Sequence, residues 1–367
     1  MKKKIIPSMN ALIIVLINGV YSETFSSQSH SEKDDVAILP KEIIISSFAK
    51  AMDENSEIFS NHFLKYTDIS TDAFAAMNTA FTSDGVFIFV PDNTIVKSPI
   101  YIINIISSKE ILLIQPHFLF VIGKNSEIKI IDSINTLNSN SKTVCNSVAE
   151  ISVGENAKVQ FYKLQNNCEK VHLISSVNVH QQKKSHFNTI TITLNGDWIR
   201  NNLNIVTDDN CESHLNGLFI THGAQHVDNH TLVDHRKPNC QSNQLYKGIL
   251  GEQSTGVFNG KIFVSRDAQK TNAYQSNKNI LLSDDATIYT KPQLEIYADD
   301  VKCSHGSTTG QINEDALFYL RSRGLNEDSA KNLLLFAFVD DVIEKIQIEP
   351  LKNHVKELVT KKLKKNK

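Results

Sequence analysis

The feature that most constrains the fold is a short motif that recurs about every thirty residues. Three segments share the order apolar residue, turn former, polar residue, asparagine and small residue: Val90–Thr94, Ile122–Ser126 and Val153–Ala157. Their asparagines, Asn93, Asn125 and Asn156, lie 32 and then 31 residues apart. Asparagine tolerates the left-handed turn conformation and can form a ladder with its neighbour. Strand, asparagine turn and strand at this period are what the stacked coils of a parallel β-solenoid require.

Short runs rich in β-branched and aromatic residues continue on both sides of this motif, from Val86 to Thr221. A β-sandwich would also contain many short strands, but it does not predict the period. The sequence therefore favours a mainly β fold with a parallel β-solenoid core over residues 85–310, and the sandwich stays the alternative.

The segments before and after this core have a helical pattern. Residues 41–80 carry an apolar stripe that begins at Ile44, with Asp72 at a plausible helix start. After residue 310, Asn313 can cap a first helix that ends at Gly324, and Asn326 can cap a second. A last amphipathic segment places one apolar face on Val355, Leu358, Val359 and Leu363. We expect an N-terminal strand and helical region over residues 1–84 and a C-terminal helical subdomain over residues 311–367.

The C-terminal helices have two roles open to them. They could form a lid on the open end of the solenoid, because a solenoid needs caps. They could equally present their large aromatic residues to a partner. The two roles do not exclude each other.

Composition and charge exclude several classes of protein. Hydrophobic residues make up 41% of the chain, which is incompatible with wholesale disorder. The 38 basic residues balance 40 acidic ones and do not pool on one segment, so nucleic acid is not predicted as a partner. The basic end, residues 361–367, is typical of a solvated helix terminus. No stretch reaches the roughly 18 apolar residues that a membrane-spanning helix needs, so no membrane partner is predicted.

Cysteine usage and the N-terminus bear on the compartment. The five cysteines are widely separated and odd in number, which argues against a disulfide framework and for a reducing compartment. Lys2–Lys4 and the apolar run from Ala11 to Ile17 imitate a secretory signal, although Pro7 interrupts it. The same run is equally typical of a buried strand that ends in a hairpin turn at Asn18 and Gly19.

The densest site chemistry lies in residues 292–310. Cys303 and His305 stand two apart, so an extended backbone points both side chains to one face. A thiolate and an imidazole on one face make half of a transition-metal or iron–sulfur site, and the other ligands must come from elsewhere. The alternative is a small buried thiol and a hydrogen-bonded turn histidine. Asp299 and Asp300 are more typical of a solvated turn than of an acid/base pair.

A second group of imidazoles and thiols occupies residues 211–240. It comprises Cys211, His214, His222, His226, His230, His235 and Cys240. The spacing of four among His222, His226 and His230 would suit a zinc site on a helix, but in a strand those positions lie about 13 Å apart. Polar side chains on the faces of the coils are the alternative. Glycine-rich phosphate loops and the Gly-x-Ser-x-Gly motif are absent from the sequence, so nucleotide binding and a nucleophile-elbow hydrolase have no support.

Linked motifs between Asp228 and Gly324 resemble the SufB/SufD family of the SUF iron–sulfur assembly system. They are Asp228–Thr231, His235, Gln244–Gly248, Gly256–Lys261, Asp267–Thr271, Lys291–Ile296, Asp299–Gly306 and Phe318–Gly324. Lys302–Gly306 is similar to the SufD branch of the family. Ser283–Ala286 stands where the SufB branch has its cluster-building cysteine, and Ala286 cannot carry sulfur.

The resemblance implies a right-handed parallel β-helix and a non-catalytic subunit that pairs with SufB. It implies a nascent iron–sulfur cluster at the seam between the two subunits, to which His305, with Cys303 beside it, contributes. It also implies that the C-terminal helices dock the ATPase SufC, so that this chain binds no nucleotide itself. The interface residues that we expect there are Phe318, Tyr319, Arg321, Arg323 and Gly324.

One departure from the family pattern concerns the N-terminus. Members usually carry a longer helical region before the strand that here is Val15–Gly19, so either the chain is shortened or its true start lies upstream. The same alignment makes the signal-like run a native strand, which favours the cytoplasm. Two alternatives of other classes remain: a secreted β-helix enzyme acting on polysaccharide, which needs paired carboxylates on one exposed face, and a homodimeric structural solenoid without metal.

Overall fold

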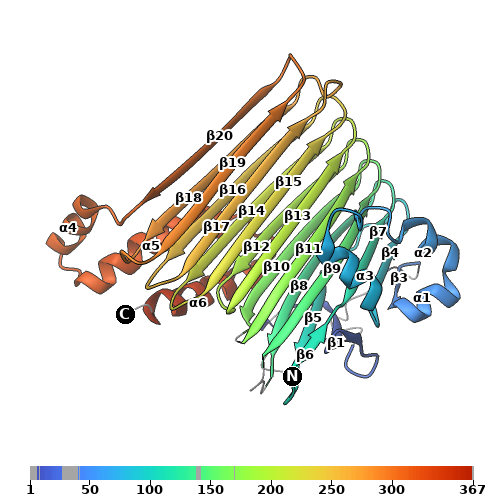
Figure 1. The fold of residues 1–367 in the computed structure, drawn as a ribbon, viewed down its shortest axis with the longest axis horizontal. Coiled ribbons are helices and arrows are strands. Elements are labelled where there is room, and N and C mark those ends of the chain that lie inside the picture. The colour runs from blue at the N-terminus through green and yellow to red at the C-terminus, as the bar shows by residue number, and fades with distance from the viewer. Residues whose placement is uncertain are drawn as a thin grey trace.

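The protein is a parallel β-solenoid of two facing sheets, with helices at its flanks (Figure 1). The computed structural model describes residues 6–7, 9–26, 40, 42–137, 142–168 and 170–365. From β4 onward, successive long strands fall alternately into the two sheets, which we name sheet A and sheet B. Neighbouring strands within each sheet pair in parallel, except β1 with β2 and β3 with β4. The mainly β solenoid that the asparagine period predicted is therefore confirmed.

The described strands form two ten-stranded sheets. In spatial order, sheet A contains β2 (Val20–Tyr21), β1 (Leu12–Ile17), β5 (Ile100–Ile106), β8 (Glu127–Thr136), β10 (Lys158–Asn167), β12 (His186–Thr193), β14 (Glu212–Thr221), β16 (Gln241–Leu250), β18 (Asn272–Leu281) and β20 (Lys302–Gly310). Sheet B contains β19 (Thr287–Ile296), β17 (Thr255–Val264), β15 (His226–His235), β13 (Trp198–Thr207), β11 (Val171–Gln181), β9 (Thr143–Val153), β7 (His117–Ile122), β4 (Gly85–Val90) and β3 (Ile44–Ser47), with β6 (Leu112–Ile114) beside β9.

One corner of each coil is a left-handed turn residue. Asn93, Asn125 and Asn156 have φ of 58°, 55° and 56°, and their side chains form a ladder. The Asn125 amide donates to the Asn93 oxygen at 2.8 Å, and Asn156 donates to Asn125 at 2.9 Å. The same corner continues at Lys184, Asn210, Asn239 and Lys270, all with positive φ. The interval shortens to 26 residues between Lys184 and Asn210, which is why a search at a fixed period finds only the first three coils.

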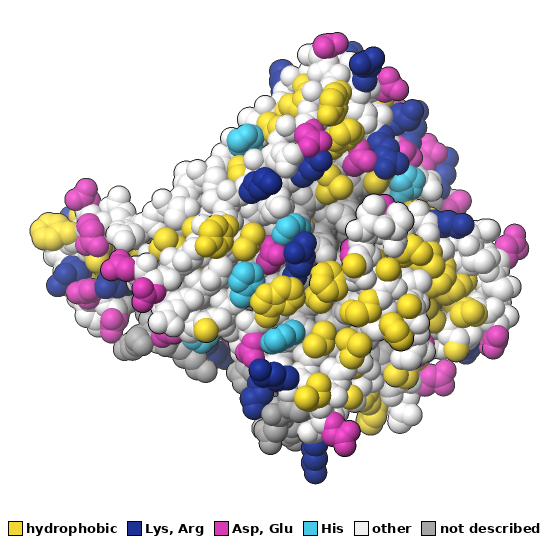
Figure 2. All heavy atoms as spheres, viewed as in Figure 1, with side chains coloured by type: hydrophobic (Ala, Val, Ile, Leu, Met, Phe, Trp, Pro, Cys, Tyr) yellow, Lys and Arg dark blue, Asp and Glu magenta, His cyan; other side chains and the backbone are white. Residues whose placement is uncertain are grey.

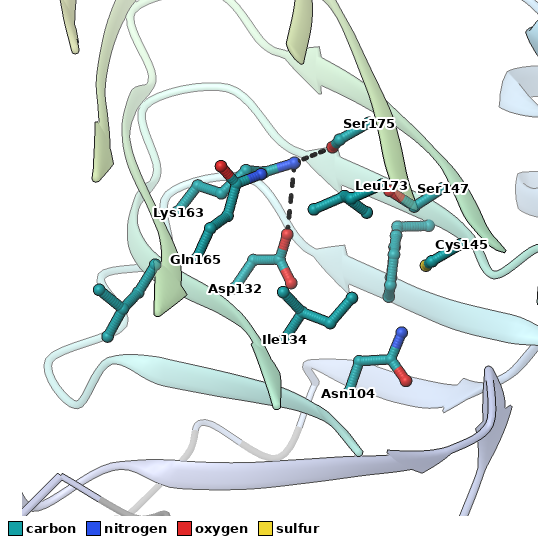
Figure 3. A pocket seen from close by; sticks show the side chains of 11 residues that line it. Asn104, Asp132, Ile134, Cys145, Ser147, Lys163, Gln165, Leu173 and Ser175 are labelled. Carbon is teal, nitrogen blue, oxygen red and sulfur yellow. Dashed lines mark hydrogen bonds and ion pairs between the residues drawn. The ribbon is translucent and has the colours of Figure 1, made fainter. Parts of the chain in front are cut away.

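The space between the sheets is an apolar core that also encloses an ion pair. Lys163 on β10 lies 3.5 Å from Asp132 on β8 and donates a hydrogen bond to Ser175 on β11 (Figure 3). Their side chains are only 7% and 18% exposed, and a cavity of about 20 Å³ beside them has room for one water molecule. Burial raises the pKa of Asp132, and Lys163 opposes that shift.

The N-terminal region combines one inner strand with three short helices. The signal-like run forms β1, which pairs with β5 and turns at Asn18 and Gly19, both with positive φ. Helices α1 (Phe48–Glu54), α2 (Ser56–His62) and α3 (Ala73–Phe81) pack on sheet B. Asp72 caps α3 as expected. Ile44, which the sequence placed on a helix, lies instead in β3, because its backbone pairs with β4.

A buried carboxylate fastens these helices to the solenoid. Glu150 on β9 is fully buried and accepts hydrogen bonds from the backbone of Leu64 at 2.8 Å and Tyr66 at 2.9 Å. His117 on β7 lies 3.1 Å from the same carboxylate and contacts Asn78 of α3 at 2.8 Å. Leu64 has φ of +57°, a strained value for a bulky residue, so the carboxylate holds a turn that the chain would otherwise avoid.

The C-terminal helices lie along the side of the solenoid. Helices α4 (Glu314–Ser322), α5 (Glu327–Ile343) and α6 (Glu349–Lys365) follow β20, and α5 packs on β14 and β16 of sheet A. Lys247 of β16 donates to the Phe338 carbonyl at 2.6 Å and to Asp341 at 2.5 Å. Asn313 and Asn326 cap α4 and α5 as predicted. The idea of a lid on the solenoid end is wrong for α5 and α6, because their apolar faces are used on sheet A. No described helix is both long and apolar enough to cross a membrane.

The enclosed ion pair gives a first prediction. We expect Asp132→Leu to lower the free energy of unfolding by about 3–5 kcal/mol, because it leaves the Lys163 ammonium group buried without a counter-charge. The double variant Asp132→Leu with Lys163→Met should recover most of that loss, since both charges leave together. Denaturant unfolding followed by circular dichroism measures the differences.

The control is the exposed pair of Lys124 and Glu155, 3.0 Å apart, where Glu155→Ala should leave the unfolding midpoint unchanged. A double variant as unstable as Asp132→Leu alone would contradict the assignment of the cost to an unpaired charge.

Candidate functional site

The solenoid ends on a coil with unpaired edges. β20 is the last strand of sheet A and β19 the last strand of sheet B, so each has a neighbour on one side only (Figure 1). Helices α5 and α6 pack on the side of sheet A and do not cover this end. An uncovered strand edge presents backbone N–H and C=O groups that can pair with another chain. The end of the solenoid is therefore a surface on which a further coil could stack.

Cys303 and His305 lie on the inner face of this last coil. They pair in register with Ala273 and Gln275 of β18, whose side chains are buried between the sheets. Cys303 is half-buried and packs on the small apolar cluster that includes Ala273, whereas His305 is exposed. Burial raises the pKa of the Cys303 thiol. The shared face that the two-residue spacing predicted is present, and it opens where β20 lacks a neighbour.

The last coil holds itself together with few contacts. Thr290 of β19 and Ser307 of β20 form a hydrogen bond of 2.7 Å across the open end. Asp299 and Asp300 form an exposed turn between the two strands, and the Asp300 backbone N–H donates to Gln269 at 2.9 Å. The two aspartates are thus turn residues, the alternative to an acid/base pair that their sequence favoured.

The two candidate ligands fit a shared site better than a complete one. Among the described residues, no group of three or more histidine, cysteine, aspartate or glutamate side chains is placed to hold a metal ion. A thiolate sulfur and an imidazole nitrogen are the donors that iron and iron–sulfur clusters accept. Their exposure on a coil with open edges leaves room for ligands from a second molecule.

The histidines of residues 211–240 do not converge. His226 stacks on Trp198 with ring centroids 6.1 Å apart, and His230 pairs with Asp228 at 2.8 Å. His222 lies 2.6 Å from the Lys362 amine on α6. Their spacing of four falls on a strand and its preceding turn, so the zinc site considered from the sequence does not form among these side chains.

A stacked pair of thiols occupies the solenoid corner, which the sequence alone does not reveal. Cys211 and Cys240 occupy equivalent positions in consecutive coils and are both buried. The neighbouring Cys240 thiol and burial raise the pKa of Cys211. His235 is fully buried nearby and contacts Thr207 at 3.1 Å and Ser242 at 2.9 Å. This arrangement belongs to the packing of the core.

Helix α4 exposes the aromatic residues that the sequence singled out. Phe318 is 73% exposed and Tyr319 56% exposed, and the Arg323 guanidinium lies 5.3 Å from the Tyr319 ring centroid. Arg321 reaches Glu327 at 3.5 Å, and Gly324 turns the chain with φ of +95°. Figure 2 shows hydrophobic side chains among charged ones at the protruding end where α4 lies. An apolar patch this exposed, with a charged rim, is typical of a protein interface.

The sequence missed the aromatic residues that surround the open end. Tyr289 and Tyr297 are 63% and 59% exposed, and Tyr274 on β18 is 44% exposed. Tyr297 packs on Phe263 with ring centroids 5.4 Å apart. Their strand periodicity resembles that of every other coil, so only the absence of a following coil distinguishes them.

Fold and site together define a β-solenoid subunit whose terminal coil presents a thiol and an imidazole for completion by another molecule. The SufBD core domain of the SUF system for FeS cluster assembly matches residues 104–338, and the SufBD N-terminal region matches residues 3–102. The chain therefore belongs to the SufBD family, and its role lies in SUF iron–sulfur cluster assembly.

Three relatives illustrate the relationship. The chain is 32% identical over 364 residues to an iron–sulfur cluster assembly SufBD family protein of Synechocystis, an alignment that covers 97% of this chain and 78% of the relative. It is 33% identical to SufD of Escherichia coli over 64% of this chain and 55% of the relative. It is 25% identical to SufD of Bacillus subtilis over 88% of this chain and 75% of the relative. Family membership leaves the polysaccharide-enzyme alternative without support.

The exposure of Cys303 gives a second prediction. Four of the five cysteines are buried and Cys303 is half-buried, so a small maleimide should label about one thiol in the folded chain and five after unfolding. Because the Cys303 pKa is raised above the ordinary 9.0, its thiolate fraction is still below one half at pH 9, and the labelling rate should keep rising beyond that pH. Mass spectrometry counts the labels. Fast labelling that survives Cys303→Ser would contradict the placement.

Proposed function

We propose that the chain is a non-catalytic scaffold subunit of a cytoplasmic SUF complex that pairs with a SufB-like subunit and docks a SufC-like ATPase. The observation that carries the proposal is the exposed imidazole of His305 beside Cys303 on a solenoid end with two unpaired edges. The nascent iron–sulfur cluster is the cargo of this seam, and ATP hydrolysis belongs to the SufC-like partner.

Pairing through the solenoid ends follows from the edges. β19 and β20 are ten and nine residues long, and both lie open along one side. A second solenoid that stacks there satisfies their backbone groups and covers the exposed tyrosines Tyr289 and Tyr297. The same contact removes His305 from bulk water, which favours a coordinated cluster over a hydrolysed one.

A SufD-like role, distinct from that of SufB, follows from what the chain lacks at the turn before β19. Ala286 is 5% exposed and packs in the apolar cluster with Ile288 and Leu281. A methyl group at this place cannot accept sulfur or bind iron. The SufB-like partner therefore supplies the building cysteine, and this chain supplies His305 and Cys303.

Docking of the ATPase is assigned to α4 and the residues that follow it. Phe318 and Tyr319 project away from the solenoid, and a groove of about 560 Å³ lies beside them between α4, α5 and the end of β18. Apolar Leu281, Ile312 and Leu335 line this groove, with Asp284 and Asp328 among its acidic residues. Such an apolar surface with an acidic rim suits a partner that offers apolar and basic side chains.

Co-expression of the tagged chain with SufB-like and SufC-like subunits tests the scaffold role. We expect recovery of a complex containing all three, with iron and sulfide after reconstitution under anaerobic conditions. His305→Ala should leave the complex intact and lower its iron and sulfide content roughly tenfold or more, because a cluster ligand is lost. The control Thr308→Ala changes the opposite face of β20 and should retain the cluster. Normal cluster content in His305→Ala would remove the ligand role, and recovery of neither partner would reject the scaffold.

The α4 surface makes a separate prediction. Phe318→Ala or Tyr319→Ala should weaken binding of the SufC-like ATPase roughly tenfold or more, because exposed aromatic residues at an interface carry much of its energy. The control Phe81→Ala removes a side chain of similar exposure, 69%, at the end of α3. Calorimetric titration of the purified chain with the ATPase gives both dissociation constants. Unchanged affinity in both aromatic variants would place the docking surface elsewhere.

A further inference from the structure

A ladder of buried amides runs across the interior of the last coils and ends beneath His305. The Thr231 hydroxyl of β15 donates to Gln244 Oε1 of β16 at 2.8 Å, and Gln275 Nε2 of β18 donates to the same oxygen at 3.2 Å. Gln244 and Gln275 are each 3% exposed. The next strand at this level of the sheet is β20, and the residue in register with Gln275 is His305.

The ladder leaves one acceptor without a donor. Gln275 Oε1 is buried and has no hydrogen-bond partner among the described residues. Because Nε2 of the same amide is committed to Gln244, the amide cannot flip without losing that bond. Buried carbonyl oxygens in folded proteins nearly always have a donor, so an orphaned one calls for an explanation.

The packing around Gln275 shows that space has been made for this amide. A Cβ atom on Gly260 of β17 would lie 2.2 Å from Gln275 Nε2 and 2.8 Å from its Cδ. Any larger residue at position 260 would therefore displace the carboxamide. The glycine, the Gln244 hydrogen bond and the sheet register together fix where Gln275 Oε1 points.

We propose that Gln275 is a positioning residue that accepts a hydrogen bond from one ring nitrogen of His305 and so presents the other nitrogen to the cluster. Residues in register on neighbouring parallel strands lie about 4.8 Å apart and point to the same face. The exposed His305 ring has no hydrogen bond of its own among the described residues, so rotation about its side-chain bonds is free to bring an N–H to Gln275. A neutral imidazole donates from one nitrogen and ligates through the other, and the hydrogen-bond partner selects which.

The inference rests on the proposed function, in which His305 is a cluster ligand, and deepens it by naming the group that orients the ligand. It also explains why the spacing of Cys303 and His305 is not the whole site. The second half of the arrangement lies thirty residues earlier, on β18, and becomes visible only when the coils are stacked in register.

The test reads the His305 ring directly in the isolated chain. Histidine labelled with ¹⁵N reports its tautomer through long-range proton–nitrogen correlation spectra at a pH where the ring is neutral, and His305→Asn identifies the signal. We expect one dominant tautomer in the unmodified chain and a mixture in Gln275→Leu, which removes the acceptor. Gln275→Glu keeps an acceptor oxygen and should restore the single tautomer.

Asn279→Ala is the matched control for loss of a buried amide. Asn279 lies on the same strand and face, is 3% exposed, and is in register with Thr309. It should leave the His305 spectrum unchanged. In the reconstituted complex, Gln275→Leu should lower the iron and sulfide content roughly tenfold, and Gln275→Glu should recover it.

The two claims fail separately. If the His305 tautomer is the same in the unmodified chain and in Gln275→Leu, the positioning role is wrong, whatever the cluster content. If the tautomer responds to Gln275 but His305→Ala retains a normal cluster, the hydrogen bond is real and the cluster-ligand role on which the inference rests is wrong. Loss of the single tautomer in Asn279→Ala would show that general loosening of the coil, and not the acceptor, controls the ring.

Discussion

Hydrogen bonding between successive coils is the constraint on which the rest of the structure depends. Each inner strand satisfies its backbone through the coil before it and the coil after it, in unbroken register from β5 to β20 along sheet A. A stack of this kind has no natural end, because every added coil creates the same unpaired edge. At the first coils, β1, β2 and β3 extend or close the edges. At the last coil, β19 and β20 remain open, and the chemistry of the protein is placed there.

The register also explains how distant residues become neighbours. Asp132 and Lys163 meet because they are in register on β8 and β10, and Gln275 meets His305 for the same reason on β18 and β20. The pairing turns a separation of about thirty residues into a distance of one strand spacing. The column of left-handed turn residues sets that separation for each coil, so the turn chemistry at Asn93, Asn125 and Asn156 contributes indirectly to every contact across the sheet.

Local chemistry in the sequence was enough to predict much of the fold. The asparagine motif predicted the solenoid and its ladder, and the caps at Asp72, Asn313 and Asn326 predicted three helix starts. Alternation along β20 placed Cys303 and His305 on one face. In each case the decisive interaction involves residues close in sequence or a repeat with a constant interval.

What could not be predicted depends on intervals that vary. The coil shortens to 26 residues between Lys184 and Asn210, so register beyond Asn156 cannot be counted from the sequence, and neither the buried Lys163 pair nor the place of Gln275 under His305 is visible there. Ile44 fits a helical stripe, yet pairing with β4 overrides that preference. The position of α5 on the side of sheet A depends on Lys247, 91 residues before its acceptor at Phe338.

The central claim is that a second solenoid subunit completes the open end at β19 and β20. Hydrogen–deuterium exchange of the chain alone and with a SufB-like subunit tests it most directly. The account predicts that binding slows exchange in peptides covering residues 287–310, while the turns at Asn93 and Asn125 exchange as before. Complex formation with unchanged exchange across residues 287–310 would contradict it.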